Sequence, residues 1–63
     1  KADDASSLEA RGDALLATGK TKEAQEAYTR ALTTLDAVSP QRRLVELKLI
    51  DAGGTPPKTG ETA

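Results

Sequence analysis

Residues 8–36, LEARGDALLATGKTKEAQEAYTRALTTLD, contain two amphipathic segments separated by a short turn, and this pattern indicates how the chain folds. In the first segment, apolar or small residues recur at i, i+4, i+7 and i+8, the spacing of one helix face. These residues are Leu8, Gly12, Leu15 and Leu16. Asp3 or Asp4 is expected to cap this helix, since an aspartate accepts hydrogen bonds from the free amides of a first turn. Gly19 suits the left-handed residue just past the helix end.

The second segment predicts another helix, capped by Thr21, with an apolar stripe that again has helical spacing. The stripe consists of Ala24, Ala27, Tyr28, Ala31, Leu32 and Leu35. Because about two residues join the segments, the helices must pack antiparallel, as a helical hairpin. Small residues on the facing stripes let the backbones approach, so a large side chain there should overpack the contact. The residues expected to pack together are Leu8, Gly12, Leu15, Ala24, Tyr28 and Ala31.

A third element is expected to begin at Ser39-Pro40, since serine as cap and proline at the first position favour a helix start. Residues 44–50, LVELKLI, also alternate as a strand would. We favour a helix, because these residues are good helix formers and a lone strand has no sheet to join. On a helical wheel the apolar residues of this segment spread almost all the way round, which is typical of a helix buried on more than one side. Leu47→Asp is therefore expected to disrupt its packing.

Charged residues are expected to lie on solvated faces. Arg42 and Arg43 are predicted to be solvated, with Arg42 able to pair with Glu46 one turn later. Glu9 and Asp13 are like charges at i, i+4, so they form either a solvated face or an acidic patch for a basic or polar peptide.

The composition excludes several classes of function. The 63 residues contain no Cys, His, Met or Trp, which excludes disulfide scaffolds, zinc modules and Cys or His catalysis. The net charge of -1, with no basic block, argues against nucleic-acid binding. Residues 19–21, GKT, lack the upstream glycine of a phosphate-binding loop, because position 14 is Ala14. We expect no enzyme activity, no cofactor and no metal.

The sequence therefore predicts an all-α fold: an antiparallel helical hairpin with a C-terminal capping helix, spanning residues 1–52. Residues 53–63, GGTPPKTGETA, have no apolar anchor and are predicted to form a disordered tail. The chain has no apolar stretch long enough to span a bilayer, and it lacks an initiator Met, so we expect it to be a piece of something longer.

The hairpin resembles one tetratricopeptide repeat over residues 8–36. The residues that carry the resemblance, at repeat spacing, are Leu8, Gly12, Leu15, Gly19, Ala24, Tyr28 and Ala31. The usual aromatic residue at the first of these positions is leucine here, and the closing proline comes late, at Pro40. The resemblance implies a protein-interaction module whose faces are buried by neighbouring repeats.

Residues 9–32, EARGDALLATGKTKEAQEAYTRAL, and 43–54, RLVELKLIDAGG, are similar to the C-terminal end of the YfgM family. That resemblance implies the last repeat of a membrane-anchored protein on the periplasmic side of a bacterial inner membrane, associated with the Sec translocon and chaperones. Repeat geometry implies a partner-binding strip on the first helix, formed by Ser6, Glu9, Asp13, Leu16 and Ala17. Its acidity predicts a protein or peptide partner rich in Lys or Arg.

Two other interpretations stay open. The chain is a structural cap that self-associates through residues 44–50, or it is a general tetratricopeptide adaptor of the cytoplasm, unrelated to secretion. A concentration-dependent helical signal favours the first, and a membrane segment upstream argues against the second.

Overall fold

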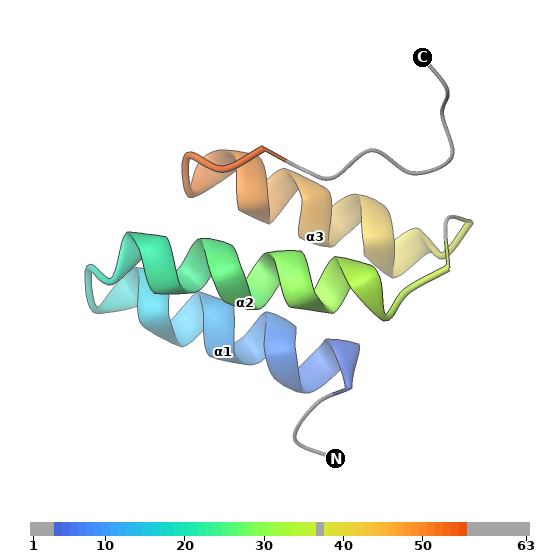
Figure 1. Ribbon diagram of the computed structural model, residues 1–63, viewed down its shortest axis with the longest axis horizontal. Coiled ribbons are helices and arrows are strands. Elements are labelled where there is room, and N and C mark those ends of the chain that lie inside the picture. The colour runs from blue at the N-terminus through green and yellow to red at the C-terminus, as the bar shows by residue number, and fades with distance from the viewer. Residues whose placement is uncertain (1–3, 37, 56–63) are drawn as a thin grey trace.

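A computed structural model describes residues 4–36 and 38–55, and within them the chain forms helices and turns without a strand. The helices are α1 (Ala5–Ala17), α2 (Thr21–Thr33) and α3 (Pro40–Asp51). Consecutive helices run antiparallel, and α2 packs against both α1 and α3 (Figure 1). The predicted all-α hairpin with a third helix is confirmed, and residues 44–50 are helical rather than extended.

The ends of α1 follow the expected chemistry. Of the two candidate caps, Asp4 takes the position, and its Oδ1 accepts a hydrogen bond from the Ser7 amide at 2.8 Å. At the other end Gly19 has a φ of +84°, the left-handed conformation that favours glycine. The Lys20 amide then donates to the Leu15 carbonyl at 2.8 Å, which satisfies a carbonyl that the helix leaves free.

The start of α2 differs from the prediction by one residue. Lys20 holds the cap position, without a side-chain hydrogen bond, and Thr21 is the first helical residue. The reason is the turn itself: Lys20 already closes α1 through its amide, so no residue remains between that turn and α2 for a separate cap. Only Thr18, Gly19 and Lys20 separate α1 from α2, which holds the two helices in a tight antiparallel pair.

The core lies where α2 meets its two neighbours. Tyr28 is 1% exposed and occupies the centre of α2, facing Gly12 of α1. A Cβ at position 12 would lie 2.5 Å from the Tyr28 ring, so glycine is needed for this close approach. Leu15, Leu16 and Leu35 are partly buried against the core. The buried core residues are Leu8, Ala24, Tyr28, Ala31, Leu32, Val45, Leu49 and Ala52.

Helix α3 buries one side only. Ser39 and Pro40 take the predicted cap and first helical positions. The side that packs on α2 contains Val45 and Leu49, both almost fully buried. Leu47 is 54% exposed, so the expectation that Leu47→Asp removes packing within this fold is wrong. Its neighbours Leu44 and Ile50 are exposed to a similar degree, because a hairpin supplies only one helix for α3 to cover.

The C-terminal end of α3 repeats the turn that closes α1. Gly53 has a φ of +88°, and the Gly54 amide donates to the Leu49 carbonyl at 2.9 Å. Gln25 of α2 adds a hydrogen bond from its Nε2 to the Ala52 carbonyl at 2.6 Å. Gly53 and Gly54, which begin the predicted tail, therefore belong to the helix cap. The rest of that prediction, residues 56–63, lies outside the described residues.

Candidate protein-binding strip across α1 and α3

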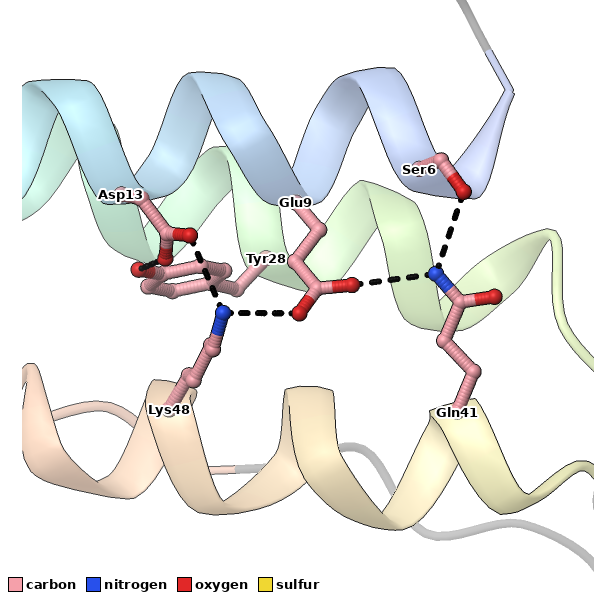
Figure 2. A network of polar contacts seen from close by, with 6 residues as sticks. All are labelled: Ser6, Glu9, Asp13, Tyr28, Gln41 and Lys48. Carbon is pink, nitrogen blue, oxygen red and sulfur yellow. Dashed lines mark hydrogen bonds and ion pairs between the residues drawn. The ribbon is translucent and has the colours of Figure 1, made fainter.

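The predicted strip on α1 faces α3 at its polar positions. Gln41 of α3 donates from its Nε2 to Ser6 Oγ at 3.4 Å and to Glu9 Oε1 at 3.0 Å. Lys48 Nζ lies 2.7 Å from Glu9 Oε2 and 3.0 Å from Asp13 Oδ2. Figure 2 shows these side chains meeting between the two helices, with α2 behind them. The polar strip thus includes two residues of α3, Gln41 and Lys48, that sequence reasoning did not assign to it.

Helical spacing explains why these residues meet. Gln41 and Lys48 are seven residues apart, two turns along one side of α3. Ser6 and Asp13 are also seven apart on α1, and Glu9 lies between them. A signal for the contact was present in the sequence, since two carboxylates at i, i+4 repel each other and are stabilised by a shared cation. Nothing in the sequence alone indicated which lysine supplies it.

Tyr28 ties the strip to the core. Its hydroxyl donates to Asp13 Oδ1 at 2.6 Å, so the one polar atom of this buried ring has a partner. Burial of the ring, with help from the Asp13 carboxylate, raises the pKa of Tyr28 from 10.0 to about 12. The hydrogen bond from Tyr28, followed by that from Lys48, outweighs desolvation and lowers the pKa of Asp13. Asp13 is therefore fixed in both position and charge.

The other ionisable groups of the strip also favour their charged forms. The hydrogen bond from Lys48 is the main reason that the pKa of Glu9 is lowered. The same contact is the main reason that the pKa of Lys48 is raised. A general acid or base works best with a pKa near the operating pH, and these shifts move each group away from neutrality. The strip is suited to electrostatic contact rather than to proton transfer.

The side chains of the strip differ in exposure, and Lys48 pairs with both carboxylates, so the strip is not a purely acidic patch. The side chain of Glu9 is 13% exposed, that of Lys48 30% and that of Asp13 48%. Two carboxylates and one ammonium group leave one negative charge. Leu16 is partly buried and packs against the core, whereas Ala17 is exposed. The accessible part of the strip is centred on Asp13.

Arg42 fixes α3 on α2, contrary to the prediction that it is solvated. It is 5% exposed, and its Nη1 donates to the Leu32 carbonyl at 2.8 Å and to the Leu35 carbonyl at 3.4 Å. Its Nε pairs with Glu46 Oε2 at 3.2 Å, as the spacing predicted. The last carbonyls of α2 need donors, and an arginine early in the next helix supplies them. Arg43, by contrast, is exposed.

A family model described as a tetratricopeptide repeat-like domain matches residues 1–54. The chain belongs to this family. The match ends at Gly54, the residue whose amide closes α3, so the tetratricopeptide repeat-like domain includes the third helix as well as the hairpin. Repeats of this kind are protein-interaction modules, which agrees with the electrostatic character of the strip. No curated protein and no solved structure matches the chain.

Metal-binding groups and membrane-spanning helices are both absent from the part of the chain that the structure describes. Residues 4–36 and 38–55 hold no group of three or more acidic, His or Cys side chains placed to bind a metal ion. In the same part of the chain, each helix is too short or too polar to cross a bilayer.

Proposed function

We propose that this tetratricopeptide repeat-like domain binds a segment of a partner protein along the strip, with Asp13 as its main contact. The observation that carries the proposal is the half-exposed Asp13 carboxylate, which shares Lys48 with Glu9. A Lys or Arg of the partner takes the place of Lys48 beside Asp13, and Lys48 keeps its shorter contact to Glu9. After this exchange Asp13 pairs with the partner's cation and Glu9 with Lys48, so binding leaves no buried charge without a partner.

The chemistry of the strip defines the partner. One uncompensated negative charge favours a segment with a single cation at the centre of the contact, rather than a long basic stretch. Ser6 and Ala17 lie at the two exposed ends of the strip on α1, where a partner backbone has room to pass. Since charged groups at an exposed contact contribute mainly to specificity and association rate, binding is expected to weaken as salt increases.

We further propose that the chain is the terminal repeat of a membrane-anchored adaptor on the periplasmic side, associated with the Sec translocon and its chaperones. The support for this proposal is the similarity of residues 9–32 and 43–54 to the end of the YfgM family. A general adaptor role in the cytoplasm is the alternative. The anchor would lie in a segment outside this chain.

The test is site-specific photo-crosslinking in the full-length protein, in its native membrane, with the probe at Ala17. This position is exposed and lies one turn beyond Asp13, so the probe leaves the contacts of Tyr28 and Lys48 in place. A matched probe at Lys22, on the exposed surface of α2, is the control. Crosslinks to translocon or chaperone subunits from Ala17 alone are expected. Equal crosslinking from both positions, or crosslinks only to another copy, would contradict the proposal.

The compartment has its own test, because the chain contains no cysteine. Ala17→Cys in the full-length protein adds a thiol for a reagent that does not cross membranes, and its labelling is compared with that of the same protein without the substitution. Labelling in spheroplasts before lysis is expected for a periplasmic location, and labelling only after lysis would favour the cytoplasmic alternative.

A second candidate function is self-association through residues 44–50. The specific observation in its favour is the set of three large apolar side chains of α3 that remain about half exposed, namely Leu44, Leu47 and Ile50.

A further inference from the structure

The exposed side of α3 is a self-complementary surface, which we call the α3 outer face. It consists of Leu44, Leu47 and Ile50, which are 49%, 54% and 53% exposed, flanked by Arg43 and Asp51. We infer that two copies of the chain pair through this face, with their α3 helices antiparallel and a two-fold axis at Leu47. The inference rests on the self-association candidate and adds to it a register, an orientation and named contacts.

The spacing of the apolar residues gives the register. Leu44 and Ile50 lie three residues before and three residues after Leu47 on one ridge of the helix. In an antiparallel pair centred on Leu47, each Leu44 therefore meets Ile50 of the partner subunit, and the two Leu47 side chains meet at the axis. A two-fold interface requires one surface to be complementary to itself, and this arrangement satisfies that requirement.

The flanking charges give the orientation. Arg43 and Asp51 lie four residues before and four residues after Leu47, about 6 Å along the helix axis on either side of it. The antiparallel register places each Arg43 beside Asp51 of the partner subunit, which forms two ion pairs. A parallel pair would place arginine against arginine and aspartate against aspartate. Both charged residues are exposed, and no hydrogen bond or ion pair joins either side chain to the rest of residues 4–36 and 38–55.

The α3 outer face and the strip lie on different sides of α3, so both can be occupied together. Lys48 and Gln41 belong to the side that faces α1, whereas Leu47 faces away from both other helices. A dimer would carry two strips, and a partner with two binding segments would gain affinity from engaging both. Three half-exposed side chains supply less area than the ~800 Å² per partner of a standard interface, so the dimer is expected to be weak.

Sedimentation equilibrium of the 63-residue chain, at concentrations on the order of 10 μM to 1 mM, measures this association. A monomer–dimer equilibrium is expected for the wild-type chain. Arg43→Glu and Asp51→Arg each replace two attractions by two repulsions, and each should raise the Kd about tenfold. The double variant Arg43→Glu/Asp51→Arg should recover the wild-type Kd, because the charges are exchanged and the antiparallel pairs form again.

Cysteine crosslinking gives a second measurement, which reports which surfaces of the two copies meet. Leu47→Cys places the only thiol of the chain at the two-fold axis, where mild oxidation is expected to link two copies rapidly. Ala14→Cys, on the exposed part of α1, is the matched control and should crosslink slowly. A chain that stays monomeric over the whole range, a double variant as weak as the single ones, or equal crosslinking at both positions would overturn the inference. Partner crosslinking from Ala17 would be unaffected by that result, so the two proposals can fail separately.

Discussion

The close contact between Gly12 and Tyr28 can be tested by adding a single methyl group. In Gly12→Ala, the new Cβ would lie 2.5, 2.7 and 2.8 Å from three carbons of the Tyr28 ring. Carbon atoms in contact prefer about 3.5–4.0 Å, so the ring would have to move by about 1 Å. Tyr28 is 1% exposed, and its hydroxyl is held by Asp13, which lies on the same helix as Gly12, so the ring has little freedom to move away.

Two opposing terms determine the net effect. Overpacking of this kind destabilises a fold by about 1–3 kcal/mol. Alanine in place of glycine inside a helix stabilises it by about 1 kcal/mol. Gly12→Ala is therefore expected to lower the free energy of unfolding by up to about 2 kcal/mol, and the melting temperature by up to about 16 °C. Thermal unfolding followed by circular dichroism measures the change.

Two further variants separate these terms. Ala14→Gly, on the exposed part of α1, should lower stability by about 1 kcal/mol, which isolates the helix-propensity contribution. In a Tyr28→Leu background the clash is removed, so adding Gly12→Ala should become stabilising by about 1 kcal/mol. A higher melting temperature for Gly12→Ala in the otherwise wild-type chain would show that the Tyr28 ring moves aside without cost and that the contact is not close in solution.

Three other predictions concern the polar contacts. Arg42→Ala should destabilise the chain by about 1.5–3 kcal/mol in urea unfolding, and Arg42→Lys should not restore it, because an ammonium group cannot reproduce the guanidinium contacts. Tyr28 is the only tyrosine, so its ultraviolet absorbance should titrate near pH 12 in the fold and near pH 10 in urea. Because this pKa is raised, its stabilising contribution is complete below pH 10 and is lost as the pH rises through 12; titration near pH 10 in the folded chain would contradict the burial. The lowered pKa of Glu9 stabilises the fold above the pKa that this carboxyl has in the unfolded chain, and the stabilisation is lost in acid. Lys48→Met removes the main cause of the lowered pKa, so the variant should lose less stability than wild type as the pH falls. An unchanged acid profile would mean that Lys48 and Glu9 do not pair in solution.

The hairpin could be predicted from the sequence because its signals are local. Helix periodicity, the cap at Asp4 and the left-handed Gly19 each act within a few residues of the position they determine. The places of Gly12 and Tyr28 on the packed faces of the hairpin also followed from helix periodicity, whereas their direct contact is seen only in the structure. The position of Thr21 failed by one residue because a single turn both closes α1 and opens α2.

The contacts of α3 could not be predicted in the same way. Arg42 reads as a surface residue in the sequence, and its burial depends on where the last carbonyls of α2 lie in space. The role of Lys48 likewise depends on the distance between α1 and α3, which no sequence spacing specifies. The apolar residues of α3 predicted burial on two sides of the helix. In the structure only the side with Val45 and Leu49 is buried, and the side with Leu47 is exposed.

The proposed contact between the exposed carboxylate of Asp13 and a cation of a partner protein can be tested by one substitution. Asp13→Asn tests it most directly, because the amide removes the charge while its oxygen still accepts the hydrogen bond from Tyr28. The affinity of the crosslinked partner for the full-length protein is measured by calorimetry at low and high salt, with wild type and variant compared. We expect the variant to bind about fivefold to tenfold more weakly than wild type at low salt, with a much smaller difference at high salt. Equal affinity of the two proteins at low salt would contradict it.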